Sequence, residues 1–115
     1  MIIENSGLKG LKSDLAHLDD SMEQLGFVRW QWEYYRATYD LQLKDRDSQN
    51  DFFLRINTRV ETGKLESPHA ILYIEDVYIG QGSFPHGVNY QAKIPDYIMK
   101  DATSKLAQLK TKLTS

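Results

Sequence analysis

The chain has 115 residues, which is the size of one domain, and we expect residues 1–115 to form a single domain. Hydrophobic residues make up 41% and charged residues 26%, a composition that excludes a disordered chain or a coiled-coil rod. The absence of cysteine excludes disulfide frameworks, thiolate zinc sites, iron–sulfur clusters and a cysteine nucleophile. A formal net charge of −2 provides no broad basic surface, so we expect no nucleic-acid partner.

The amino terminus does not have the pattern of a signal peptide, because Glu4 directly follows the apolar residues Met1, Ile2 and Ile3. No window of the sequence approaches the roughly 18 apolar residues that a membrane span needs. We therefore expect a cytoplasmic protein that has no membrane partner.

Apolar residues at spacings of three and four predict an amphipathic helix near the amino terminus. These residues are Leu8, Leu11, Leu15, Leu18, Met22 and Leu25. Ser6 or Ser13 is a suitable N-cap, and Gly26 is a suitable left-handed residue to end the helix. The stripe is shorter than three heptads, so it favours packing against a sheet over a coiled coil.

After Gly26 the apolar residues alternate along the chain, as in a strand. The first set is Val28, Trp30, Trp32 and Tyr34, and the second, of opposite parity, is Tyr35, Ala37, Tyr39, Leu41 and Leu43. Because no turn residue lies between Tyr34 and Tyr35, we predict one long strand with a β-bulge, or two collinear strands. The alternative is a strand that different neighbours bury on both faces.

The second half of the chain predicts two further strands and a closing helix. A strand with one apolar face runs from Phe52 to Val60, and another runs from Ala70 to Ile79. Gly80–Tyr90 is predicted to be a long loop, which includes at most one short strand, and Pro95 opens the helix. The expected fold class is α+β: an antiparallel sheet of about four strands in the order α-β-β-β-β-α, with the N-terminal and C-terminal helices packed on one face.

Candidate catalytic groups are few. His69 and His86 have no partner histidine at the spacing of metal ligands, and Gly80-Gln-Gly82 lacks the third glycine of a dinucleotide loop. No nucleophile-elbow motif is present. We therefore predict no catalytic residue, no metal and no cofactor. An enzyme that uses His86 as its acid or base is the weakest hypothesis.

Binding is better supported, since aromatic residues crowd the strand after Gly26 and Trp, Tyr and Arg dominate interaction hot spots. The candidate binding residues are Trp30, Trp32, Tyr34, Arg55, Arg59, Phe84, His86 and Tyr90. The leading hypothesis is a non-enzymatic interaction domain that forms a homodimer through the aromatic-rich strand, because two helices do not easily cover both of its faces. The alternative is a binder of a small anionic ligand, with the Gly80–Tyr90 loop closing over a pocket near Arg55, Arg59 and His86.

Short motifs along nearly the whole chain carry a resemblance to a known family. They are Gly7–Leu11, Gly26–Arg29, Trp32–Tyr34, Thr38–Asp40, Phe53–Arg55 and Phe84–Tyr90. Together they resemble the YugN-like family of small bacterial proteins, and the Pro-His-Gly-Val sequence at 85–88 is the most specific part. The resemblance implies a compact α+β domain with terminal helices around an antiparallel sheet. It implies no catalytic or binding role, because the family is uncharacterised.

Overall fold

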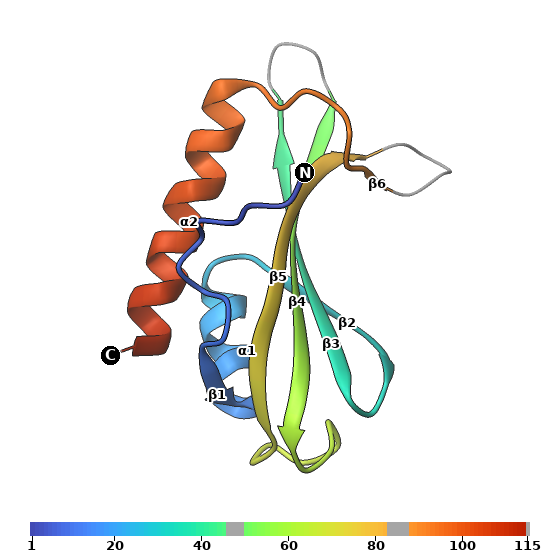
Figure 1. The fold of residues 1–115 in the computed structure, drawn as a ribbon, viewed down its shortest axis with the longest axis vertical. Coiled ribbons are helices and arrows are strands. Elements are labelled where there is room, and N and C mark those ends of the chain that lie inside the picture. The colour runs from blue at the N-terminus through green and yellow to red at the C-terminus, as the bar shows by residue number, and fades with distance from the viewer. Residues whose placement is uncertain (46–49, 83–87, 115) are drawn as a thin grey trace.

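Figure 1 shows the fold of the computed structural model, which describes residues 1–45, 50–82 and 88–114. The elements in chain order are β1 (Lys12–Asp14), α1 (Leu15–Gln24), β2 (Val28–Glu33), β3 (Arg36–Lys44), β4 (Asp51–Thr62), β5 (Ile71–Gly82), β6 (Val88–Asn89) and α2 (Asp96–Thr114). The described strands form one antiparallel sheet, and both helices lie on the same side of it (Figure 1), so the α+β prediction is confirmed. Within the described residues the sheet has six strands where about four were expected, because β1 lies where the start of the first helix was predicted and the long strand predicted after Gly26 is two strands, β2 and β3.

The two edges of the sheet differ. The strand order is β1-β5-β4-β3-β2, and β6 also pairs with β5. Between β1 and β6, the first residues of the chain continue this edge: Ile3 N donates to Val77 O at 2.8 Å, and Ile79 N donates to Met1 O at 2.9 Å. At the opposite edge, β2 pairs with β3, and no other strand of the described residues lies beside it. One edge is therefore covered by backbone pairing, and the other is formed by β2.

Tyr34 and Tyr35 form the turn of a β-hairpin, so the prediction of one long strand or two collinear strands is wrong. Glu33, the last residue of β2, pairs with Arg36, the first residue of β3. Backbone hydrogen bonds from Val60 N to Tyr35 O (2.8 Å) and from Leu65 N to Tyr34 O (3.0 Å) hold the turn. The change in the alternation of apolar residues at Tyr34 and Tyr35 therefore marks the end of β2 and the start of β3. The alternative of a strand buried on both faces is also wrong, because the outward residues of β2 are exposed.

Helix α1 is shorter than the leucine spacing predicts. Its N-cap is Asp14, whose carboxylate accepts a 3.0 Å hydrogen bond from His17 N, so neither Ser6 nor Ser13 starts the helix. The preceding residues instead pair with β5 as β1, although Leu8 still lies in the core with none of its surface exposed. Gly26 has a φ of 93°, as expected of the residue that ends the helix.

The core lies between the helices and the inner face of the sheet. The alternation predicted for β4 is confirmed, because Phe52, Leu54 and Ile56 are buried and their neighbours are less so. The buried residues of α2 are Ile98, Ala102, Leu106 and Leu109, whose spacings of four, four and three place them on one face of the helix. With the core on one side only, the outward residues of the strands are left to form a separate surface.

Candidate functional site

The outward side chains of β2 to β5 form a surface on the side of the sheet opposite the helices, which we call the open face. They include Val28, Trp30, Arg36, Thr38, Asp40, Arg55, Asn57, Arg59, Glu75 and Tyr78. Successive side chains of a strand point to opposite faces of the sheet, so residues next to these in the chain point toward the helices. Three of the predicted binding residues, Trp30, Arg55 and Arg59, therefore share one surface.

Each guanidinium nitrogen of Arg55 donates a hydrogen bond on the open face. Its Nε and Nη2 donate to Oδ1 and Oδ2 of Asp40 at 2.8 and 2.9 Å, and its Nη1 donates to the Tyr90 hydroxyl at 2.8 Å. The hydrogen bond to Asp40 raises the pKa of Arg55, whereas burial lowers it. Because every guanidinium nitrogen of Arg55 is already engaged, this residue ties strands together and is a poor first contact for a ligand.

Tyr90 reaches Arg55 because glycine occupies position 80. The Tyr90 ring lies 5.4 Å from the Tyr78 ring, centroid to centroid, at an angle of 51°. A Cβ at Gly80 would lie 2.6 Å from Val88 Cγ1 and 2.7 Å from Asn89 O, so any larger residue would push the chain at 88–90 off the sheet. The end of the predicted Gly80–Tyr90 loop thus joins the open face. Phe84 and His86 lie outside the described residues.

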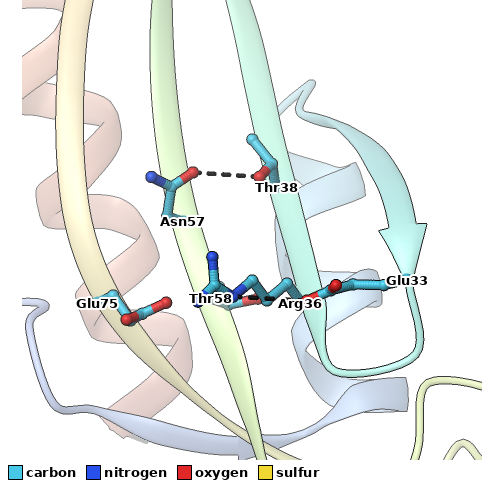
Figure 2. A pocket seen from close by; sticks show the side chains of 6 residues that line it. All are labelled: Glu33, Arg36, Thr38, Asn57, Thr58 and Glu75. Atoms are coloured by element: carbon cyan, nitrogen blue, oxygen red, sulfur yellow. Dashed lines mark hydrogen bonds and ion pairs between the residues drawn. The ribbon is translucent and has the colours of Figure 1, made fainter.

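A pocket of about 310 Å³ opens on the same face, at the end nearest the β2–β3 turn. Its lining comes from four strands: Glu33, Arg36, Thr38, Asn57, Thr58 and Glu75. Figure 2 shows the Arg36 side chain extending from β3 across β4, while Glu75 points toward it from β5. Above them, Thr38 Oγ1 donates to Asn57 Oδ1 at 3.1 Å (Figure 2).

The charged groups around this pocket form loose ion pairs. Arg36 Nε lies 3.5 Å from Glu33 Oε1, and Arg59 Nε lies 3.6 Å from Glu75 Oε1. Arg36 and Arg59 are direct cross-strand partners, an arrangement that is unfavourable unless carboxylates compensate it. Arg59 Nε is buried and has no hydrogen-bond partner, which marks the network as incomplete.

Both glutamates of the pocket lie at irregularities of the sheet. The register between β2 and β3 shifts between Gln31 and Glu33, and Glu33 is the cross-strand partner of Arg36. The register between β4 and β5 shifts where Glu75 lies, since Ile56 pairs with Val77 but Thr58 pairs with Ile74. Bulges of this kind re-aim side chains and are common beside binding sites.

The remaining predicted binding residues lie apart from the pocket lining. Trp30 is outward on β2, and Tyr34 is exposed in the hairpin turn, with Lys64 Nζ 5.9 Å from its ring centroid. Trp32 belongs to β2, but the structure does not describe its side chain. Trp30 and Tyr34 therefore lie along the edge strand and its turn, whereas Arg55 and Arg59 lie on β4 in the middle of the open face, where Tyr90 contacts Arg55.

The histidines that the structure describes have no catalytic arrangement. His17 Nε2 lies 3.1 Å from Lys112 O at the helix–helix contact, and the backbone N–H of His69 donates to Ser67 Oγ. Within residues 1–45, 50–82 and 88–114, no three His, Asp or Glu side chains gather closely enough to hold a metal ion.

Comparison with known proteins identifies the family. The model of the YugN-like family matches residues 4–113. The chain belongs to the YugN-like family. The motif resemblance in the sequence is thereby confirmed. No helix of this YugN-like chain, in the part that the structure describes, is long and apolar enough to cross a membrane.

Two relatives support this membership. The uncharacterized protein YlbA of Bacillus subtilis (strain 168) is 38% identical over 86 residues, which are 74% of this chain and 70% of that protein. The crystal structure of the uncharacterized conserved protein YugN from Geobacillus kaustophilus HTA426 has a TM-score of 0.84 at 31% identity, covering 99% of this chain and 95% of that one. Because both relatives are described as uncharacterized, function has to be derived from this YugN-like chain's own residues.

Sequence reasoning missed the residues that line the pocket. It gave no role to Glu33, Thr38 or Asn57. Strand alternation could have put Thr38 and Asn57 on the open face. Their pairing depends on the cross-strand register, which alternation alone does not determine.

Proposed function

We propose that this YugN-like protein is a non-enzymatic interaction module that self-associates through β2. The observation that carries the proposal is the exposure of Val28 (59%) and Trp30 (50%), outward residues of an edge strand. Tyr34 and Tyr35 are exposed to a similar extent and extend the apolar surface into the turn. We call these four residues the β2 patch. Exposed apolar surface that is concentrated in this way is typical of interaction sites.

The pairing of the sheet edges also supports β2 as the interface. At the β5 edge, β1, β6 and residues 1–3 supply backbone partners. At the β2 edge, no strand of the described residues does so. An edge strand without such cover tends to pair with a strand of another chain.

A second copy of this chain is the partner that this geometry favours. In a two-fold dimer the same patch meets itself, so an apolar patch is automatically matched by an apolar patch. Antiparallel pairing of two β2 strands would bring Val28 and Trp30 of one copy beside the same residues of the other. Trp and Tyr supply large contact area at low entropic cost, which suits them to this role.

The test is the mass of the protein in solution. We expect native mass spectrometry and sedimentation velocity to give a dimer for the wild type at micromolar concentration. Val28→Lys and Trp30→Glu, made separately, should give the monomer, because each puts a charge into the apolar interface. Tyr97→Glu is the control, since Tyr97 is an exposed aromatic residue on α2, away from β2.

Two outcomes would contradict self-association through β2. One is a wild type that keeps the monomer mass across the micromolar range. The other is a dimer that persists in both β2 variants. Circular dichroism and melting temperatures of the variants, compared with the wild type, establish that each is folded before its mass is interpreted.

The other two hypotheses have different support. Ligand binding is favoured by the pocket on the open face, which uses Arg36 and Glu75 in place of the Gly80–Tyr90 loop. The enzyme hypothesis depends on His86, which lies outside the described residues, and no contact of the described residues favours it.

A further inference from the structure

The open-face pocket has a cationic wall and an anionic wall. Arg36 extends over β4 from one side, and the carboxylate of Glu75 faces it from the other (Figure 2). These two groups do not pair with each other: Arg36 is beside Glu33, and Glu75 is beside Arg59. The space between the two walls therefore lies between opposite charges.

Hydrogen-bonding capacity in the pocket is left unused. Asn57 Oδ1 accepts a hydrogen bond from the Thr38 hydroxyl, which leaves the Nδ2 amide hydrogens available to donate to a ligand. Among the hydrogen bonds of the described residues, none uses the Arg36 guanidinium or the carboxylate oxygens of Glu33 and Glu75. By contrast, each guanidinium nitrogen of Arg55, two residues before Asn57 on β4, already donates a hydrogen bond. The pocket thus has donors at Arg36 and Asn57 and acceptors at Glu33 and Glu75.

The balance of charge selects the kind of ligand. The two glutamates would repel a ligand that carries negative charge alone, and Arg36 would repel one that carries positive charge alone. A molecule that carries both charges can pair its negative group with Arg36 and its positive group with a glutamate of the pocket. The volume of about 310 Å³ is at the small end of the range for ligand pockets.

We propose that this pocket binds a small zwitterion that carries a carboxylate and an amino group, such as a free amino acid. Arg36 and the Asn57 amide bind the carboxylate, and Glu75 binds the ammonium group. Both glutamates lie at irregularities of the sheet and line the pocket. The proposal is independent of self-association, since the β2 patch contributes none of the residues that line the pocket.

The test is a titration of the isotope-labelled wild type followed by NMR. The probes are the free L-amino acids at millimolar concentration, each compared with its N-acetyl and its carboxamide derivative. We expect at least one free amino acid to shift the Arg36 Nε–H and the Asn57 side-chain amide resonances. Its two derivatives, which each lack one charge, should bind at least about tenfold more weakly, since one charged contact contributes 1.4 kcal/mol or more.

Variants link the binding to the two walls. Arg36→Gln and Glu75→Gln should each abolish the shift of the Asn57 side-chain amide, and both replace solvent-accessible side chains with ones of similar or smaller size. Lys44→Gln is the matched control, because it removes an exposed charge from the same strand as Arg36 but outside the pocket. It should bind as the wild type does.

Three results would overturn the proposal: no free amino acid shifts these resonances, the blocked derivatives shift them equally, or Glu75→Gln binds unchanged. The mass measurement that tests self-association does not depend on any of these. Failure of one proposal is therefore distinguishable from failure of the other.

Discussion

The Tyr39 hydroxyl on β3 donates a 2.6 Å hydrogen bond to Oδ1 of Asp19 on α1. The other oxygen of this carboxylate lies 3.1 Å from Nη1 of Arg29 on β2. One carboxylate therefore connects helix α1 to both strands of the first hairpin. Tyr39 itself is 1% exposed, so this polar contact lies at the boundary of the core.

Removing the Tyr39 hydroxyl tests the contribution of this contact to stability. We expect Tyr39→Phe to lower the free energy of unfolding by about 1–2 kcal/mol, because the ring stays and one hydrogen bond to a charged group is lost. Urea denaturation measures the change. Tyr35→Phe, in the exposed turn, should change it by less than about 0.5 kcal/mol. Equal effects of the two substitutions would show that the Asp19 hydrogen bond adds nothing.

The same tyrosine predicts a dependence of stability on alkaline pH. Burial, followed by the hydrogen bond and the charge of Asp19, raises the pKa of Tyr39 above its ordinary value of 10.0, and Arg29 opposes the shift. The folded state therefore keeps a proton that the unfolded chain releases above pH 10.0, so the stabilisation is complete below this pH and is lost as the pH rises further.

We expect the free energy of unfolding of the wild type to fall above this pH by up to about 1.4 kcal/mol per unit more steeply than that of Tyr39→Phe. Urea denaturation of both proteins at several values between about pH 9 and pH 11 measures the two slopes. The variant is its own control for the other tyrosines and the lysines, which both proteins share. Parallel slopes would contradict the shifted pKa.

The fold could be predicted from the sequence wherever one face of an element is buried. Phe52, Leu54 and Ile56 alternate because only the inner face of β4 meets the helices, and the stripe of α2 follows for the same reason. The hairpin at Tyr34 and Tyr35 could not be predicted, because its turn has no Gly, Asn or Asp. Its backbone carbonyls are instead bound by amides at positions 60 and 65, which are distant in the sequence.

The candidate site could be predicted less well than the fold, because it depends on the register between strands. Alternation indicates that Arg36, Arg55 and Arg59 lie on the same face of the sheet, but it does not show which of them has hydrogen-bond partners. Arg55 is tied to Asp40 by the register of β3 and β4, whereas Arg36 lies opposite Arg59. Both facts depend on which residue of one strand faces which residue of the next.

The Arg55–Asp40 pair should contribute more to stability than an exposed ion pair of equal length. Asp40 is only 11% exposed and receives two hydrogen bonds from Arg55. We expect Asp40→Asn to lower the free energy of unfolding by about 1–3 kcal/mol, because it removes the charge and sets an amide donor against a guanidinium donor. Urea denaturation measures the loss.

Lys12 and Glu61 supply the matched control. Their nitrogen–oxygen distance is also 2.8 Å, but both side chains are well exposed. Glu61→Gln should therefore cost less than about 0.5 kcal/mol. If the two substitutions cost the same, the Arg55–Asp40 pair does not tie β3 to β4 more strongly than a surface pair does.

Glycine at position 80 should be required for stability because of the close approach of the chain at 88–90. In Gly80→Ala the new methyl group would meet Val88 Cγ1 and Asn89 O at 2.6 and 2.7 Å, so this segment has to move. We expect a loss of about 1–3 kcal/mol in urea denaturation. Gln81→Ala, on the same strand, adds no such contact and should cost less than about 1 kcal/mol.

A double-mutant cycle shows whether Gly80 acts by positioning Tyr90. Tyr90→Phe removes the hydroxyl that accepts from Arg55 Nη1, and alone it should cost about 1 kcal/mol. In the Gly80→Ala background the same change should cost little, because the displaced Tyr90 no longer reaches Arg55. If Tyr90→Phe costs the same in both backgrounds, the glycine is needed for the β5–β6 contact alone, and Tyr90 keeps its place on the open face without it.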